Sequence, residues 1–589
     1  MPTPWNNPYI PGDPFSYDLK WIVKQIKEHT TILSTLDDRI VDLISQLLDQ
    51  HDPLYFNNVD ELIHSGLKHG SLAYIMGYYD RGDGGSNLYY ITTDYNDVLN
   101  AISFITLDGA NKWAIPIITT QYVTPQMFGA KMDGATSDRE ALNTAIKYKN
   151  VFLLNGVYAV DFDENNDALI IDDDISLILD ENAVIKAIPT SNGHYSILHI
   201  TGENVKIEGG IIQGERDDHT GSTGEFGHAI HLDGAKNVKI SDTVLCDCWG
   251  DGIIFGDHKC ENVTLTHVTM DNNRRNGCSI INAETVNFTD CYFINSNGTS
   301  PQAGLDFEID NVSTENIKDV FINNCFFSNN TGPGLVLARL GHDCGFIKIS
   351  NCELYKNPLE FHERNTEIVD GSVVVENVTI KETAFYAIRF SNKQRTGYQI
   401  IMNGINCIDT HTSTSTDYQY STLISLWPGS NVADDCGNIA IRGLFVDTRG
   451  NTTKHPALFG YTGNTYYELD VEVDKIKGMA PSFMQISNCK YTVKIDDVEV
   501  VTNGSTKNYS AAGNLCSPHT VVTNGGGMTV STAGGCRGPL TLSNSGATNA
   551  RITLGNSETF FDSPNYRDIA GGSKMTIMYD ETNAHWIIV

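Results

Sequence analysis

The sequence has few basic residues and no long hydrophobic run. Its 589 residues include 40 Lys and Arg against 72 Asp and Glu, which gives a formal net charge of −32. A protein that tracks phosphates needs the opposite charge, so we expect no binding to nucleic acid. No stretch of about 18 apolar residues occurs, and we expect no membrane insertion. The first residues, MPTPWNNPYIPGDPF, lack a basic region followed by an apolar run, and we therefore expect no signal peptide.

Cysteine is absent from the first 245 residues, and the 13 cysteines that follow show no C-x-x-C pair with the spacing of a zinc site. We therefore expect free, buried thiols, no bound metal and no cofactor. The sequence also lacks a G-x-S-x-G motif, which makes an esterase the least favoured class of enzyme.

A heptad pattern occupies the N-terminal segment, residues 1–50. Apolar residues recur at two heptad positions with one polar interruption: Leu19, Ile26, Leu33, Ile40 and Leu47 at one, and Ile22, His29, Leu36 and Leu43 at the other. This predicts a coiled coil, with an amphipathic helix on a globular core as the alternative. Because Ile and Leu mix at both positions, a trimer is favoured, with His29 meeting its copies on the axis.

Three further domains are expected. Gly and Asp clusters between aromatic pairs, as in GYYDRGDGGSNLYYIT, predict a small β-rich neck over residues 51–120. Residues 121–514 form a lid helix, which starts near Ser137 and ends near Tyr148, and a repeat region that follows it. Residues 515–589 contain alternating segments such as ARITLGN and predict a β-sandwich, either for trimerisation or for carbohydrate binding.

The middle of the chain is a repeat. Similar segments start at residues 205, 238, 263, 286, 320, 347 and 373, from VKIEGGII to VVVENVTI, at intervals of 23 to 34 residues. One β-rich coil per repeat predicts a parallel β-helix. A β-propeller has similar periods but needs four strands per repeat, for which these units are too short. Cys291, Cys325 and Cys352 share one repeat position and should stack inside the core.

A second strand recurs in each coil and defines two outward columns. SPQAGLDFEID, residues 300–310, is one example, in which Leu305 and Phe307 should face the core. The expected first column is His231, Ile254, Ser279, Asp306, Val336, Glu360 and Arg389. The second is Asp233, Gly256, Ile281, Glu308, Ala338, His362 and Ser391. This places the acids on one exposed face of a long rod.

These segments resemble bacteriophage tailspikes and related pectate-lyase-like β-helix proteins that degrade polysaccharides. The resemblance covers about residues 70 to 400, and rests on GYYDRGDGGSNLYY, on VTPQMFGAKMDGATSD, and on the run from GERDDH through GEFGHAIHLDG, CWGDGIIFG and NNRRNGCSI to SPQAGLDFEI. In the family's lid pattern a Gly stands where this chain has Met132, and an acid where it has Ser137. The resemblance implies a mainly β fold with a right-handed parallel β-helix, a homotrimer, and attachment to the phage tail or head–tail connector through the N-terminus.

Glycoside hydrolysis needs a carboxylic acid and a second carboxylate. Asp306 and Glu308 supply two on one strand face, and Asp251 in WGDG is a further catalytic candidate. Alternatively, Asp306 and Glu308 form a solvated strand face without a catalytic role, and Asp251 is a turn residue. The predicted substrate-binding residues are Arg274, Arg275, Arg216, His219, Glu225, His228, His231, Trp249, Glu360 and His362. Arg274 and Arg275 could hold an acidic sugar or only neutralise nearby acids, and Trp249 could stack on a sugar or lie buried at a coil corner.

The sequence thus predicts a virion tailspike that acts at the host cell surface. It is expected to bind and depolymerise a bacterial capsule, exopolysaccharide or teichoic-acid-like polymer by glycoside hydrolysis. A polysaccharide lyase on the same fold stays open, because His and Arg residues accompany the acids. A receptor-binding spike without activity is the alternative from another class.

Overall fold

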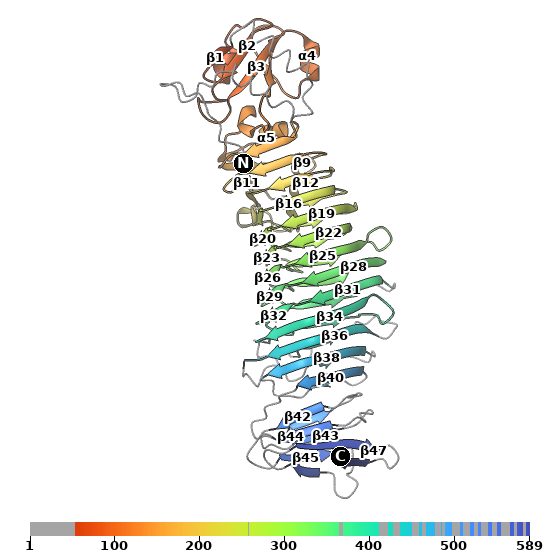
Figure 1. The fold of residues 1–589 in the computed structure, drawn as a ribbon. Helices are drawn as coiled ribbons and strands as arrows, with labels where there is room; N and C mark the ends of the chain where they lie inside the picture. Colours follow the sequence, from red (N-terminus) through yellow and green to blue (C-terminus); the bar gives the residue numbers. More distant parts are fainter. Residues whose placement is uncertain are drawn as a thin grey trace, which may run out of the picture. The chain divides into compact units, whose positions relative to one another are not determined.

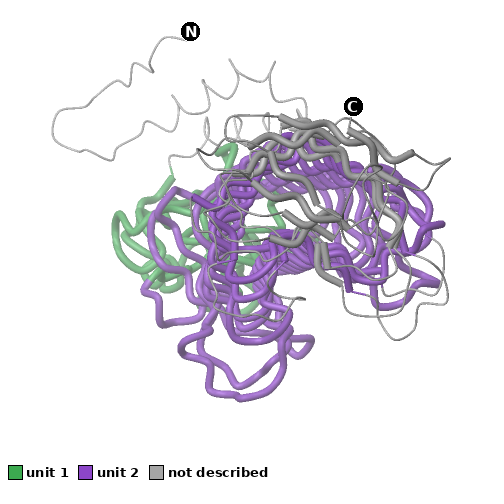
Figure 2. The backbone as a smooth tube through the Cα atoms, turned by 90° about the horizontal axis from the view of Figure 1, so that it is seen from below, with its two compact units in different colours: residues 1–132, 140–154 green, residues 133–139, 155–589 purple. Residues whose placement is uncertain are grey.

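The computed structural model describes residues 53–449 except 257, 364–368, 412–421 and 428–435, and beyond residue 449 it describes the strands β37 to β48. The coiled coil predicted within residues 1–50 lies outside the described residues. The chain divides into two compact units, residues 1–132 with 140–154, and residues 133–139 with 155–589 (Figure 2).

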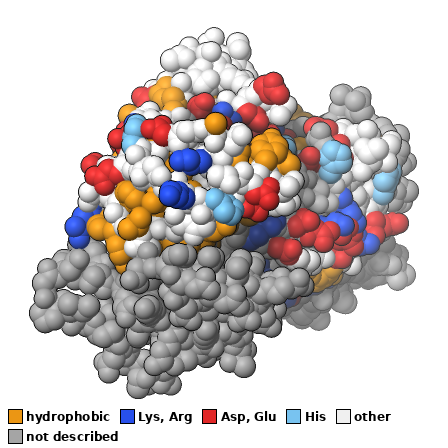
Figure 3. All heavy atoms as spheres, turned by 90° about the horizontal axis from the view of Figure 1, so that it is seen from above, with side chains coloured by type: hydrophobic (Ala, Val, Ile, Leu, Met, Phe, Trp, Pro, Cys, Tyr) orange, Lys and Arg blue, Asp and Glu red, His pale blue; other side chains and the backbone are white. Residues whose placement is uncertain are grey.

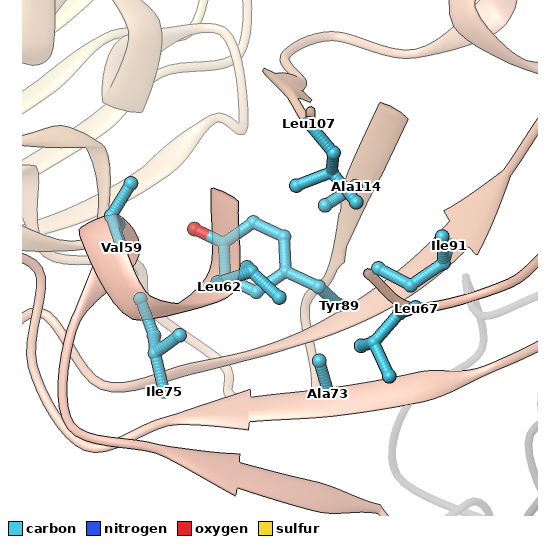
Figure 4. Close-up of a cluster of buried hydrophobic side chains, with 9 residues drawn as sticks. All are labelled: Val59, Leu62, Leu67, Ala73, Ile75, Tyr89, Ile91, Leu107 and Ala114. Carbon is cyan, nitrogen blue, oxygen red and sulfur yellow. The ribbon is translucent and has the colours of Figure 1, made fainter. Parts of the chain in front are cut away.

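The first unit contains a five-stranded sheet in the order β1-β2-β3-β5-β4. Its apolar core lies between this sheet and helix α3, where Leu62, Ile75 and Tyr89 meet (Figure 4). Asn58 caps α3, because its side chain accepts a hydrogen bond from the Glu61 backbone N–H. The elements are β1 (Leu54–Phe56), α3 (Val59–Ile63), β2 (Leu72–Ile75), β3 (Asn87–Thr92), α4 (Tyr95–Asn100), β4 (Ile105–Thr106), β5 (Trp113–Ile117), η1 (Pro125–Phe128) and β7 (Asn150–Leu153).

Helix α5 (Arg139–Ile146) matches the predicted lid helix but ends two residues before Tyr148. Its buried side chains include Leu142, Ala145 and Ile146, as the apolar pattern predicts. Its role as a lid stays a prediction.

The second unit is a stack of parallel coils (Figure 1). From β13 to β33, each coil gives two strands to a large sheet and one to a second sheet of 12 strands. The large sheet includes β6 (Asp133–Ser137), β8 (Val157–Val160), β10 (Ser176–Leu179), β11 (Val184–Ala187), β13 (Lys206–Glu208), β14 (Ile211–Gln213), β16 (Lys236–Ser241), β17 (Val244–Cys246), β19 (Cys260–Thr266), β20 (Thr269–Asp271), β22 (Ala283–Thr289), β23 (Tyr292–Ile294), β25 (Ile317–Asn323), β26 (Phe326–Ser328), β28 (Asp343–Ser350), β29 (Glu353–Tyr355), β31 (Asp370–Glu376), β32 (Thr379–Lys381), β34 (Gln399–Ile408), β36 (Cys436–Asp447), β38 (Tyr467–Lys477) and β40 (Cys489–Asp497).

The 12-stranded sheet carries the predicted columns. Its strands are β9 (Asp167–Ile171), β12 (His194–Ile200), β15 (Phe226–Leu232), β18 (Ile253–Phe255), β21 (Cys278–Ile280), β24 (Leu305–Glu308), β27 (Leu335–Arg339), β30 (Leu359–His362), β33 (Ile388–Ser391), β35 (Ile424–Trp427), β37 (Phe459–Tyr461) and β39 (Met484–Gln485). The predicted repeat and its parallel pairing are confirmed by this arrangement.

The coil interior is apolar and contains free thiols. Cys291, Cys325 and Cys352 are buried in successive coils, as predicted. The ten cysteines whose side chains the structure describes are all free, and only Cys246 among them is partly exposed. On the face drawn in Figure 3, acidic, basic and hydrophobic side chains are interspersed, and the described atoms there form no continuous basic area.

The predicted β-sandwich of residues 515–589 stays a prediction. The described backbone there belongs to two four-stranded sheets, which also include β41 (Lys507–Ser510). One has the order β41-β43-β45-β46, with β43 (Met528–Ser531), β45 (Ala550–Leu554) and β46 (Tyr566–Ile569). The other has the order β42-β44-β47-β48, with β42 (His519–Thr523), β44 (Leu540–Asn544), β47 (Lys574–Asp580) and β48 (His585–Ile588).

Candidate active site

The first outward column is formed as the sequence predicts. Strand register places His231 beside Ile254, Ile254 beside Ser279, and Ser279 beside Asp306. It then continues through Val336 and Glu360 to Arg389. The intervening side chains, such as Leu305 and Phe307, are fully buried in the coil interior.

The second column is broken at Glu308. Strand β24 shifts register between Phe307 and Glu308, so that Glu308 lies opposite Arg339 and not opposite Ala338. The prediction of an unbroken column was wrong at this point, because a bulge inserts one residue into the pairing. The column resumes where His362 pairs with Ser391.

The expected exposure of the acids was also wrong. Asp306 is only 2% exposed and Asp251 is 0% exposed. Glu308 keeps 24% of its side chain exposed. Arg275, from the turn before β21, lies against Asp251 and Glu308 and is itself only 12% exposed.

Arg275 binds two of the three predicted catalytic residues, Asp251 and Glu308. Its Nη1 donates to Asp251 Oδ2 at 2.9 Å and to Ser279 Oγ at 3.1 Å, and its Nη2 donates to Glu308. Its Nε lies 3.8 Å from Glu225 Oε2. Burial alone would lower the pKa of Arg275, but the charges of Asp251 and Glu308 outweigh it and raise the pKa. The guanidinium therefore stays charged.

Two of the acids hold protons unusually tightly. Burial raises the pKa of Asp251 to about 6, although the nearby Arg275 opposes this shift and the Asn276 backbone N–H donates to its Oδ1 at 2.9 Å. Burial and the charge of Glu308 raise the pKa of Asp306 well above its usual range. The Oδ1 atom of Asp306 is buried and has no hydrogen-bond partner in the described structure.

His228 completes the buried part of the site. The Asp251 backbone N–H donates to His228 Nδ1 at 3.1 Å, so the ring proton lies on Nε2. Burial lowers the pKa of His228 well below its usual range, and the neighbouring His231, Arg275 and His194 lower it further. The imidazole is therefore neutral. His231 stacks on His199, with ring centroids 4.7 Å apart.

The predicted groove residues beside the acids are held by contacts within the protein. The Trp249 ring has His219 stacked on it at 3.7 Å and the Arg274 guanidinium over it at 3.9 Å. Two groups this close to one ring centroid cannot share a face without overlap, so both faces of Trp249 are covered. His219 contacts the buried Glu215 at 2.9 Å. Arg216 donates to Asn272 and Asn297, at 2.8 and 2.6 Å.

Glu360 and His362 belong to a different cluster. Glu360 accepts a hydrogen bond from Tyr386 Oη at 2.6 Å, and its Oε2 lies 2.6 Å from His362 Nε2. Burial would raise the pKa of Glu360, but contact with His362 outweighs it and lowers the pKa. Val336 and Ala338 lie on β27, the strand between this cluster and the acids, and form a buried apolar group with Ala303, which precedes β24. Ser279, Tyr386 and Arg389 are site residues that our sequence-based selection missed, although Ser279 and Arg389 belong to the predicted first column.

The raised pKa of Asp251 gives a test of the geometry. The stability contributed by this group is fully present below its ordinary pKa of 3.8 and is lost as the pH rises through about 6. We expect the melting temperature of wild type, relative to that of Asp251→Asn, to fall between pH 4 and pH 6.5. Thermal melting across this range measures the difference. A difference that does not change with pH would contradict the buried placement of Asp251.

Comparison with known proteins identifies the repeat region. Residues 150–311 match the family model described as the right handed beta helix region. This part of the chain is a right-handed β-helix. Within the residues that the structure describes, no group of three His, Cys, Asp or Glu is arranged to hold a metal ion, and no helix is long and apolar enough to cross a membrane.

Relatives of this β-helix protein occur in Bacillus subtilis (strain 168). It is 31% identical over 214 residues to the uncharacterized protein YclG, and this match covers 31% of this chain and 37% of YclG. It is 29% identical over 252 residues to the SPbeta prophage-derived uncharacterized protein YorA, and this match covers 38% of this chain and 42% of YorA. The matched segments thus span less than half of each relative.

Solved structures match this chain at low identity. The tailspike protein gp49 from Acinetobacter baumannii bacteriophage Fri1, a capsular polysaccharide depolymerase, is 13% identical, with 74% of this chain and 76% of that chain covered and a TM-score of 0.48. The A-module of the mannuronan C-5 epimerase AlgE4 from Azotobacter vinelandii is 15% identical, with 63% and 99% covered and a TM-score of 0.49. Such likeness concerns the fold and says nothing of activity.

Proposed function

We propose that this β-helix protein is a bacteriophage tailspike that binds and depolymerises a polysaccharide of the bacterial surface by carboxylate-mediated glycoside hydrolysis. The observation that carries the proposal is the acid cluster around Arg275, in which a buried Asp306 holds a proton beside the partly exposed Glu308. The prophage origin stated for YorA supports a phage context. The polymer is a capsule, an exopolysaccharide or a teichoic-acid-like polymer.

In the proposed reaction Glu308 meets the glycosidic oxygen, because it is the only one of the three predicted catalytic carboxyls with appreciable exposure. It takes the proton that Asp306 holds and passes this proton to the leaving oxygen, so that Asp306 is left as the carboxylate until it is reprotonated from solvent. Glu225, whose side chain is 38% exposed on the Nε side of Arg275, receives the proton of the attacking water. Asp251 holds the Arg275 guanidinium in position.

Two alternatives remain as outcomes of the test. A lyase needs a cation for the uronate and a base, but Arg275 already binds Asp251 and Glu308, and His228 is buried. A receptor-binding spike would use the same surface without cleavage. Attachment to the tail or head–tail connector through residues 1–50, and assembly as a homotrimer, belong to this proposal.

The test is incubation of the full chain with purified capsule, exopolysaccharide and teichoic acid from candidate hosts. We expect one of these polymers to be shortened, with new reducing ends and with products that each gain one water by mass spectrometry. Unsaturated products without added water would establish a lyase, and binding without cleavage would establish an adhesion spike. Light scattering on the same sample should give the mass of a trimer, and a monomer mass would contradict the predicted coiled coil.

A further inference from the structure

A second polar patch lies on the outward face of β30, β33 and β35. Register places Glu360, Arg389 and Ser425 in one column and His362, Ser391 and Trp427 in the next. The alternating residues of these strands are fully buried, and they are Leu359, Phe361, Ile388, Phe390, Ile424 and Leu426. The six polar and aromatic side chains therefore share the side of the sheet that faces away from the coil interior, where Glu360, Ser391 and Ser425 are nevertheless buried.

Besides His362 Nε2, which lies 2.6 Å from Glu360 Oε2, three buried polar atoms of this patch have no hydrogen-bond partner within the protein. They are Arg389 Nε, Ser391 Oγ and Ser425 Oγ. Folded proteins pair the great majority of such atoms, so a concentration of unpaired ones on neighbouring strands points to a ligand that pairs them. Arg389 is held from its other side, because Nη1 donates to Tyr386 Oη at 3.0 Å and the guanidinium lies 4.5 Å from the Trp427 ring centroid.

The patch is separate from the acid cluster. Strands β24 and β33 are three strand spacings apart, which is roughly 14 Å at about 4.8 Å each. Val336, Ala338 and Ala303 form the buried apolar group between the two places. A ligand at Arg389 therefore need not touch Arg275 or Glu308.

The charged groups of the patch indicate the chemical class of its ligand. Glu360 already faces the Tyr386 hydroxyl and His362, and both of its oxygens are thereby engaged. The Nε edge of Arg389 remains for an acceptor, and a guanidinium binds a planar carboxylate with paired hydrogen bonds. The adjacent serine hydroxyls can donate to or accept from the hydroxyl groups of a sugar.

We propose that this patch is a saccharide-binding subsite for an acidic sugar, in which Arg389 binds the carboxylate of a hexuronate and Ser391 and Ser425 bind its hydroxyl groups. The choice of a saccharide as ligand rests on the proposed function. The subsite itself requires no cleavage, so a binding measurement tests it independently.

The experiment is isothermal titration calorimetry of the full chain with trigalacturonate, its methyl ester and inorganic phosphate. We expect trigalacturonate to bind at least roughly tenfold more tightly than the ester or phosphate, because only the sugar acid offers both the carboxylate and the hydroxyls. Arg389→Gln should weaken this binding by about tenfold or more. Arg442→Gln, which alters a partly buried Arg on β36 of the other sheet, should leave it unchanged.

Ser425→Ala separates binding from folding. Removing an unpaired buried hydroxyl should leave the melting temperature unchanged or raise it, yet should weaken trigalacturonate binding severalfold. Equal binding of acid and ester, phosphate binding as tight as trigalacturonate, or no binding at all would overturn the subsite. So would binding that Glu308→Gln abolishes and Arg389→Gln leaves intact. Uronate binding without cleavage of any host polymer would keep the subsite and overturn the enzyme.

Discussion

Glu308→Gln is expected to lower the rate of glycan cleavage by roughly 100-fold to 10,000-fold, the contribution of a general acid or base. The substitution keeps the size of the side chain but removes the carboxylate that we propose takes up the proton of Asp306. Asp306→Asn should cause a loss of similar size, because it removes the proton that Glu308 receives. Reducing-end release from the host polymer measures both rates.

Asp310→Asn is the matched control for these variants. Asp310 lies two residues beyond Glu308 but is exposed, so cleavage should stay near the wild-type rate. Melting temperatures should show that all three variants fold, since Leu305 and Phe307 still fill the coil interior. Near-wild-type cleavage by both Glu308→Gln and Asp306→Asn would refute the proposed role of this pair.

Arg275→Met is expected to reduce the free energy of unfolding by about 3–5 kcal/mol at neutral pH, because it leaves buried carboxylates without their cation. Arg275 is itself largely buried and contacts Asp251 and Glu308 directly. The loss should shrink as the pH falls towards about 6, because the variant lacks the charge that lowers the pKa of Asp251 and therefore protonates Asp251 at a higher pH than wild type does. Denaturant unfolding at pH 7.5 and pH 5 measures both values.

The control for this variant is Arg442→Met, in which a partly buried Arg of β36 that the structure places outside the acid cluster is changed. The Arg442→Met substitution should change the free energy of unfolding little at either pH. An Arg275→Met variant as stable as wild type at pH 7.5 would show that Arg275 does not compensate the buried acids. A large loss of unfolding free energy that is the same at both pH values would mean that the effect comes from lost packing.

The repeat could be predicted from the sequence because a coil is a local unit. Each coil alternates buried and outward residues, so the strands and their register follow from a short pattern that recurs along the chain. The pairing of Ser279 with Asp306, and of Glu360 with Arg389, follows directly from that register. The buried cysteine column at Cys291, Cys325 and Cys352 is predictable for the same reason.

The chemistry of the acids depended on contacts that no repeat encodes. Arg275 and Asp251 lie in turns between strands, where the strand alternation does not apply, and only the folded chain brings Arg275 against both Asp251 and Glu308. The register shift after Phe307 likewise depends on how two neighbouring coils fit together. Trp249 is likewise covered by His219 and Arg274, which come from other turns. Strand alternation is set by near neighbours in the sequence, whereas burial and pKa are set by residues that tertiary packing brings from other coils.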